Sequence, residues 1–169
     1  MISNAFRSLR PSYPDIVNEH VTRLVAAQVT IVATLLLISA QPVFLAYLMY
    51  EFLARLLYGP RFSLMVLIAQ RFIIAPAGIL MKPTAGPPKR FAQSIGLVFT
   101  LSAALIWITT GSFATPFWLM FVLISFAFLE AAFGLCAACL MFNLMIRIGV
   151  IPERVCVQCS NLSISRRSA

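Results

Sequence analysis

The sequence of 169 residues is poor in charge, and above all in negative charge. Only five residues are acidic, one is histidine, and charged side chains make up 11% of the chain, against about 25% in soluble domains. So little charge excludes a water-soluble domain of ordinary composition. The hydrophobic fraction of 61% and the mean hydropathy of +0.94 indicate instead that the main solvent is lipid.

The residue types that catalysis needs are also scarce. The single histidine, His20, lies in a polar amino-terminal stretch, where we expect it to be solvated. The sequence contains no evident Ser-His-Asp set, phosphate-binding glycine loop or paired-carboxylate site. The net charge of +8 is not accompanied by a basic stripe interleaved with aromatic residues, so nucleic-acid binding is not expected. The sequence leans away from an enzyme without excluding one.

Long apolar runs separated by helix-breaking residues dominate the chain. A membrane span takes about 20 residues, so four spans with short links nearly exhaust this length. We predict an all-α, polytopic membrane protein with four transmembrane helices and one interfacial or re-entrant helix. The predicted spans cover about 24–40, 43–58, 91–110 and 117–147 in a membrane domain at 24–149, between polar tails at 1–23 and 150–169. A competing interpretation of the first run is a signal peptide cleaved after Ala40.

The segment 62–80 is long enough to cross a membrane but carries Gln70 and Arg71 at its centre. Because an arginine there costs about 2.5 to 3.5 kcal/mol, we expect this segment to be the interfacial or re-entrant helix. If it crossed the membrane, the chain would have five spans. The proline-containing stretch 81–90 that follows predicts a basic loop, and not regular helix.

The distribution of positive charge predicts the orientation. All thirteen Lys and Arg residues fall on one side of the four-span arrangement, and the two opposite turns carry none. By the positive-inside rule the charged side is cytoplasmic. Both termini and all the cysteines are therefore expected in the cytoplasm.

Four cysteines form the most chemically distinctive motif. They make two C-x2-C pairs separated by sixteen residues, a spacing typical of zinc sites. Four thiolates complete a tetrahedral zinc shell, and Pro152 would allow the tail to fold back onto the helix end. The candidate metal or redox residues are Cys136, Cys139, Cys156 and Cys159.

Redox chemistry is a second possible use of these thiols. On a continuous helix, residues three apart have Cβ atoms about 5 to 6 Å apart, whereas a disulfide prefers about 3.8 Å. A bridge between Cys136 and Cys139 would therefore need local unwinding, and cross-pairing with the tail cysteines is easier. The cytoplasm disfavours permanent disulfides. The open alternatives are a zinc site, thiol exchange or a persulfide relay, and inert thiols.

Helical geometry also selects neighbours for the thiols. On one helix through 117–147, Asn143 and Arg147 share the face of the two helical cysteines and are the candidate supporting residues. Glu130 lies roughly opposite the second of these cysteines. Unless the helix breaks at Gly134, Glu130 is not part of the cysteine site.

Ionisable side chains inside the predicted spans are further functional candidates. Glu51 and Arg55 are four apart on the second span and can pair. The simpler interpretation is that Arg55 reaches toward the headgroups while Glu51 holds it. Glu130 has no partner on its own helix, so we expect it to meet Arg71, Arg90 or Arg55. Such charges would also suit a small transporter or an accessory subunit of a membrane complex.

Several short motifs occur in a fixed order along the chain. They are Val17-Asn18-Glu19, Gly59-Pro60-Arg61 with Phe62-Ser63, Pro87 to Gln93 with Ile95-Gly96, Leu129-Glu130, Phe133 to Cys136, Cys139, Ile151-Pro152-Glu153, and Cys156 to Cys159. Over about residues 15–160, this order resembles a bacterial membrane-protein family classed as a domain of unknown function. Leu64 and Ala138 depart from the family pattern, and neither departure removes a thiol.

The resemblance implies four helices and a four-cysteine signature in the bacterial cytoplasmic (inner) membrane. It also implies thioredoxin-like or rhodanese-like partners, because family members occur beside or fused to such proteins, and hence a role in thiol or sulfur metabolism. We therefore expect a small integral membrane protein, in contact with the lipid bilayer, whose cytoplasmic cysteine site binds zinc or exchanges thiols.

Overall fold

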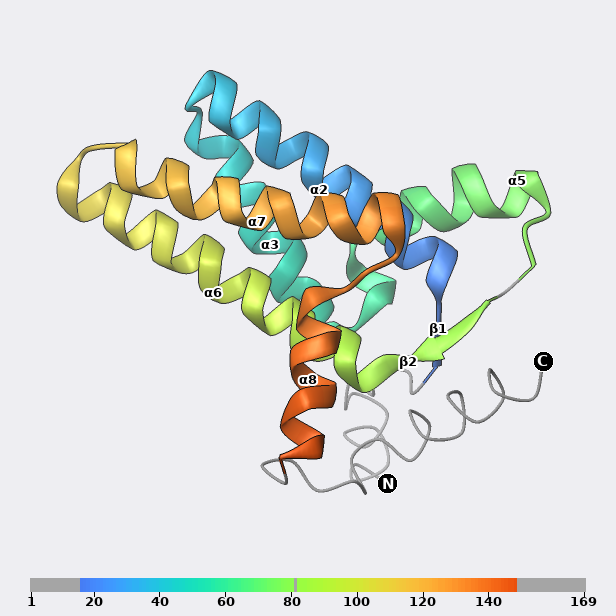
Figure 1. The fold of residues 1–169 in the computed structure, drawn as a ribbon. Helices are drawn as coiled ribbons and strands as arrows, with labels where there is room; N and C mark the ends of the chain where they lie inside the picture. The colour runs from blue at the N-terminus through green and yellow to red at the C-terminus, as the bar shows by residue number, and fades with distance from the viewer. Residues whose placement is uncertain (1–15, 81, 149–169) are drawn as a thin grey trace, which may run out of the picture.

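Long apolar runs become helices because the membrane interior offers the backbone no hydrogen-bond partner but itself. The computed structural model describes residues 16–80 and 82–148. Its long helices are α2 (Glu19–Ser39), α3 (Pro42–Tyr58), α6 (Gly86–Thr110) and α7 (Ala114–Phe133). They run alternately up and down, with α2 against α3 and α7, and α6 against α3 and α7, so the four close into a ring (Figure 1).

Three of these helices, α2, α6 and α7, are long and apolar enough to cross a membrane. The prediction of a helical membrane protein is thereby confirmed. The predicted span at 43–58 corresponds to α3, whose 17 residues extend roughly 25 Å, less than the hydrocarbon core of about 30 Å. Within the described residues, the length criterion is met by three helices rather than the predicted four.

Two helices begin earlier in the sequence than hydropathy predicts. The Asn18 side chain accepts a hydrogen bond from the backbone N–H of His20 at 3.1 Å, which caps α2 so that it begins at Glu19 and not at residue 24. α6 begins at Gly86, with prolines in its first turn, so the prediction of a non-helical stretch through residue 90 was wrong. Proline is tolerated there because the first-turn N–H groups have no partner within the helix.

The segment between the two helix pairs is short and irregular. It consists of η1 (Pro60–Phe62), α4 (Leu64–Ile68), the π-helical η2 (Ala69–Ile74) and α5 (Ala75–Ala77). The helical character predicted for 62–80 is therefore confirmed as far as Ala77. Strand β1 (Ile16–Asn18) then pairs antiparallel with β2 (Pro83–Ala85) and ties the start of α2 to the start of α6.

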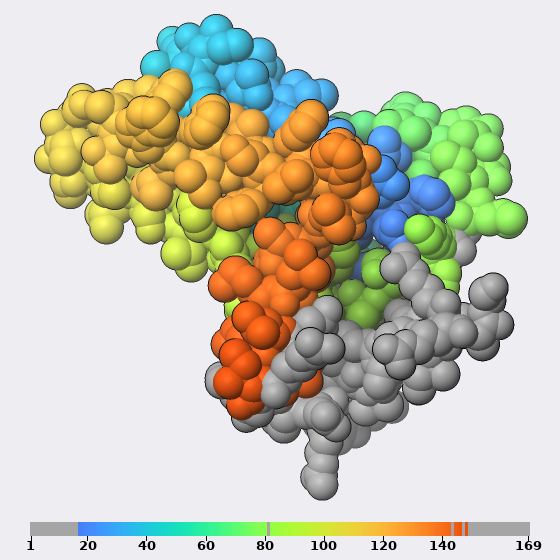
Figure 2. All heavy atoms as spheres, viewed as in Figure 1, coloured from blue at the N-terminus to red at the C-terminus, as the bar shows by residue number. Residues whose placement is uncertain are grey.

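The predicted fourth span is two helices. Gly134 adopts a left-handed backbone with φ of 69° and ends α7, and a new helix, α8 (Ala137–Arg147), begins three residues later. The span predicted for 117–147 is therefore interrupted at Gly134, the residue at which the sequence allowed a break. α8 packs against α6 and projects from the end of the bundle (Figures 1 and 2).

Close packing between α3 and α6 depends on one glycine. Gly96 faces the ring of Phe52 so closely that an added Cβ would overlap the ring. Only a residue without a side chain leaves room for the ring in this position. The ring of helices is completed around buried Leu36, Leu48 and Met120.

Candidate dithiol site

The break at Gly134 changes the environment of the first cysteine pair. Cys136 adopts an extended backbone and is the N-cap of α8, where its Sγ accepts a hydrogen bond from the N–H of Cys139 at 3.3 Å. Its carbonyl accepts the first helical bond, from Leu140 at 3.0 Å. The local unwinding that a bridge between the two cysteines requires is therefore present, because only Cys139 lies within the helix.

The two thiols form one hydrogen-bonded unit. The hydrogen bond from the Cys139 thiol lowers the pKa of Cys136, and the Lys89 ammonium acts in the same direction, while burial and Glu130 oppose both. The hydrogen bond to Cys136 raises the pKa of Cys139, and burial acts in the same direction with a smaller effect. The pair therefore favours a state with a Cys136 thiolate and a protonated Cys139.

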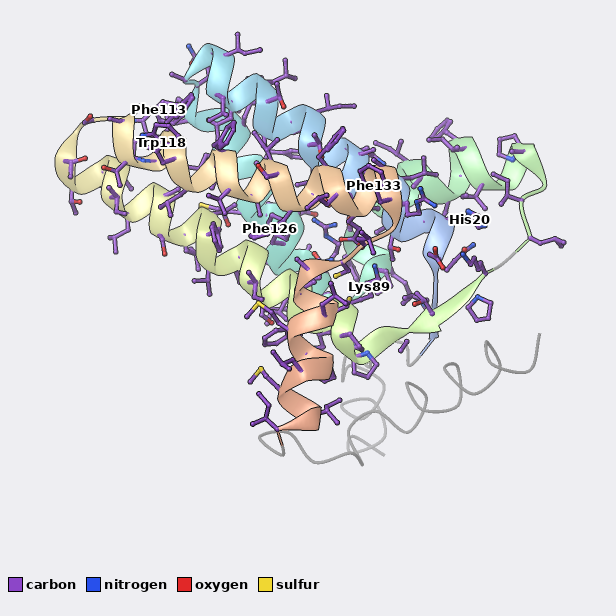
Figure 3. The ribbon with its side chains drawn as sticks, in the orientation of Figure 1. His20, Lys89, Phe113, Trp118, Phe126 and Phe133 are labelled. Atoms are coloured by element: carbon purple, nitrogen blue, oxygen red, sulfur yellow. The ribbon has the colours of Figure 1, made fainter. Side chains whose placement is uncertain are left out.

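An ion pair lies beside these thiols at the junction of α6, α7 and α8, where Figure 3 shows Lys89. The Lys89 ammonium pairs with the Glu130 carboxylate, and their side chains are only 8% and 18% exposed. The expectation that an arginine would pair with Glu130 was thus wrong about the partner. Because the helix breaks at Gly134, Glu130 belongs to the surroundings of the cysteines.

Arg23 stabilises the same junction from α2. Its Nη2 donates to the carbonyl of Ala132 at 2.7 Å, and Nε and Nη2 both donate to the carbonyl of Ala131 at 3.3 Å. These are among the last carbonyls of α7, which lack helical partners. Sequence reasoning did not select Arg23 or Lys89, since both were interpreted only as markers of membrane orientation.

Glu51 and Arg55, predicted to share one face of the second span, are in contact on α3. Glu51 is fully buried, and its carboxylate accepts hydrogen bonds from the Ser63 hydroxyl and from the N–H of Leu64 at 2.9 Å. Arg55 Nε donates to the backbone carbonyl of Glu51 at 3.0 Å. Glu51 therefore caps the start of α4 and holds the segment after α3 against the bundle.

Part of the predicted site lies outside the described residues. Cys156 and Cys159 belong to 149–169, and the side chains of Asn143 and Arg147 are likewise not described, although both residues lie on α8. Within 16–80 and 82–148, no group of three His, Cys, Asp or Glu side chains is placed to hold a metal ion. The four-cysteine zinc site stays a prediction.

Comparison with known proteins identifies a family for this chain. The family model described as "Domain of unknown function (DUF4395)" matches residues 17–147. The chain belongs to this family. The DUF4395 match includes every helix described above and the first cysteine pair. Among curated proteins and solved structures, nothing matches the chain.

Proposed function

We propose that this DUF4395 protein is a membrane dithiol–disulfide exchange protein that works through Cys136 and Cys139. The observation that carries the proposal is the hydrogen-bonded C-x2-C pair at the start of α8, with Cys136 at the N-cap. A helix N-terminus, a nearby lysine and a C-x-x-C arrangement each stabilise a thiolate. All three occur together here, since Lys89 lies beside the pair.

The exposures of the two cysteines suggest different roles. Cys136 is 8% exposed, whereas Cys139 is half-buried. In the oxidised pair, the thiolate of a partner would attack the sulfur of Cys139, forming a mixed disulfide and releasing Cys136 as a thiolate. A thiol of low pKa leaves faster. The second thiol of the partner then attacks the mixed disulfide, and Cys139 leaves and takes a proton.

The direction of exchange depends on which redox form of the Cys136 and Cys139 pair is stabilised. The hydrogen bonds from Cys139 and the charge of Lys89 favour the reduced pair, because they act on the Cys136 thiolate. Stabilising the reduced form makes a disulfide a stronger oxidant. Dithiol proteins, such as the thioredoxin-like partners that the family resemblance implies, are therefore the proposed substrates, and Cys156 with Cys159 is the predicted second pair.

The experiment is a redox titration of the detergent-purified full chain in glutathione buffers, with the linkages identified by peptide mass spectrometry. We expect a disulfide between Cys136 and Cys139 in the wild type. Cys136→Ser is expected to leave one glutathione bound on Cys139, because the thiol that would displace it is gone. The Cys156→Ser/Cys159→Ser variant is the control and should still form the first disulfide.

Two results would contradict the proposal. One is that glutathione disulfide leaves both helical cysteines reduced. The other is that the purified protein carries about one zinc ion per chain, lost in Cys136→Ser and in Cys156→Ser alike, with none of the four thiols free to react. That second outcome would favour the four-cysteine metal site.

A further inference from the structure

A cavity of about 530 Å³ lies between the four long helices, the segment that follows α3 and the start of α8, and Cys136 forms part of its wall. Most of its wall is apolar and comes from all four long helices, with Val21, Val25, Phe52, Ile95, Phe99 and Leu123 as examples. Its size is within the range of small-molecule sites, about 300 to 1,000 Å³. The wall also includes polar residues, namely Asn18, Arg55, Gln93 and Glu130. A ligand that is largely apolar and carries a few polar groups therefore matches this wall.

Cys136 forms part of the wall of this cavity, and Cys139 does not. Because Cys136 is almost completely buried, a reagent meets its sulfur from the cavity side. The pair thus has two sides, with Cys136 turned to the cavity and Cys139 more exposed. A molecule in the cavity is placed to react with the same dithiol that the proposed exchange reaction reduces.

One polar group in the cavity wall has an unmet hydrogen bond. The Oε1 atom of Gln93 is buried and has no hydrogen-bond partner within residues 16–80 and 82–148. Leaving a buried acceptor unpaired costs about 1 to 3 kcal/mol. Because the Gln93 side chain lines the cavity, rotation of its amide toward a ligand with a hydroxyl group would recover that cost. The Gln93 amide carries both an acceptor and donors, so it can pair with a hydroxyl or with a carbonyl.

We propose that this cavity binds a lipid-soluble quinone, which reoxidises the Cys136 and Cys139 dithiol. The inference rests on the proposed exchange function and names the final electron acceptor. The apolar ring and tail of a quinone can pack against the apolar part of the wall. Its carbonyls, and the hydroxyls that they become on reduction, can form hydrogen bonds with the Gln93 amide. A quinone also accepts the two electrons that the thiols lose when they form a disulfide. An acyl chain of a lipid would fill the space but leave the amide unpaired.

The reaction balances without a further reagent. The pair loses two electrons and two protons in total, the proton on Cys139 and the one that Cys136 gave to the solvent on becoming a thiolate, and one S–S bond forms between Cys136 and Cys139. The quinone gains the two electrons and two protons, so both carbonyls become hydroxyls and the product is a hydroquinone. The hydroquinone is apolar enough to leave into the surrounding lipid, and the disulfide is then ready for the next partner dithiol.

The test is anaerobic oxidation of the reduced full chain by decylubiquinone and, separately, by a short-chain menaquinone. Both have fully substituted rings, so a stable thioether cannot form. We expect one Cys136–Cys139 disulfide per hydroquinone produced. Ala92→Leu fills the cavity from α6, and Ala104→Leu is its control, because Ala104 is also half-buried on α6 but does not line the cavity.

The variants separate this inference from the proposed function. Ala92→Leu should slow oxidation by quinone at least tenfold but leave oxidation by glutathione disulfide within twofold of wild type. Ala104→Leu should match wild type with both oxidants. Ala127→Leu fills the same cavity from α7 and replaces Ala92→Leu if that variant does not fold.

Three results would overturn the inference. If both cavity variants react with quinone like wild type, the cavity is not the site. If neither quinone oxidises a wild-type pair that glutathione disulfide does oxidise, the electron acceptor is wrong while the exchange function stands. If glutathione disulfide also fails, the exchange function falls and takes this inference with it.

Discussion

The two ends of the helical bundle are built from different chemistry. At the hairpin end, where the turns 39–42 and 110–114 lie, no residue is ionisable, and aromatic rings pack together, Trp107 and Phe113 with centroids 4.6 Å apart. At the opposite, cysteine end, Lys82 pairs with Glu19 at 2.9 Å and Lys89 pairs with Glu130. One end suits anchoring in the membrane interface, and the other positions reactive groups.

Substitutions at the two ends of the bundle should therefore have different effects. Aromatic contacts at the hairpin end add to packing but do not orient any titratable group. At the cysteine end, the same contacts that hold the helices together also surround the thiols. A change there should alter both stability and thiol chemistry, whereas a change at the hairpin end should alter stability alone.

The largest effect is expected for Lys89→Met. Glu130 would stay largely buried without its cation, which costs about 2 to 4 kcal/mol of unfolding free energy. Loss of the ammonium also raises the pKa of the Cys136 thiol and makes the reduction potential of the pair more negative, by about 30 mV per tenfold change in the equilibrium constant. Unfolding in sodium dodecyl sulfate and a glutathione titration measure the two quantities.

Lys82→Met is the matched control for that variant. It also removes a lysine from an ion pair, but the Lys82 side chain is 48% exposed, so the expected cost is below about 1 kcal/mol. The potential of the cysteine pair should not move. Equal effects of the two lysine variants on that potential would show that Lys89 has no specific role at the thiols.

The second effect is a difference between the two thiols in how their alkylation rates depend on pH. The pKa of Cys136 is lowered and that of Cys139 is raised. As pH rises, Cys136 should therefore become a thiolate first, and at pH 7 a small neutral alkylating reagent should modify it at least tenfold faster than Cys139. Peptide mass spectrometry after timed quenching gives both rates. Faster modification of Cys139 would show that access to the sulfur, and not the difference in pKa, controls the reaction.

A third, smaller effect compares one glycine from each end. Gly134 and Gly111 have φ of 69° and 65°, and an added Cβ meets no overlapping atom at either. Replacing either with alanine should cost about 1 to 2 kcal/mol, because a side chain disfavours this backbone. Only Gly134→Ala should also change the alkylation rate of Cys136. An equal change in Gly111→Ala would remove the distinction between the ends.

The smallest effect is expected for Trp118→Ala at the hairpin end. The Trp118 side chain is 66% exposed, and its ring contacts are with Phe117 and Phe121 at centroid distances of 5.7 and 6.1 Å. We expect a loss of about 0.5 to 1 kcal/mol in detergent and unchanged thiol reactivity. A change in the redox titration of the cysteines would show that the two ends communicate.

Hydropathy was sufficient to predict the helical membrane fold, but it could not predict which glycine breaks a helix. Gly96 and Gly134 both lie in apolar runs, yet Gly96 stays helical and packs against Phe52, whereas Gly134 ends α7. The difference comes from tertiary contacts, since Arg23 binds the carbonyls just before Gly134. Such contacts join residues more than a hundred positions apart and leave no periodic pattern.

The spacing of the cysteines was enough to select them as a candidate site, but it did not predict their neighbours. The supporting residues were chosen on the assumption of one continuous helix. Once the chain turns at Gly134, Lys89 lies beside the pair and Glu130 is no longer set apart. The predicted arginine partners of Glu130 were reasonable by charge alone, and only the packing of α6 against α8 selects Lys89.

The uncharged turns of the hairpin end also bear on how the chain enters a membrane. Each helix pair, α2 with α3 and α6 with α7, has at its tip only a short turn without ionisable side chains. Each pair can therefore insert as a unit, with no charged group carried across the hydrocarbon. The ladder between Val17 and Thr84 joins the two pairs at the opposite end of the bundle, and it can form only when both pairs are in place.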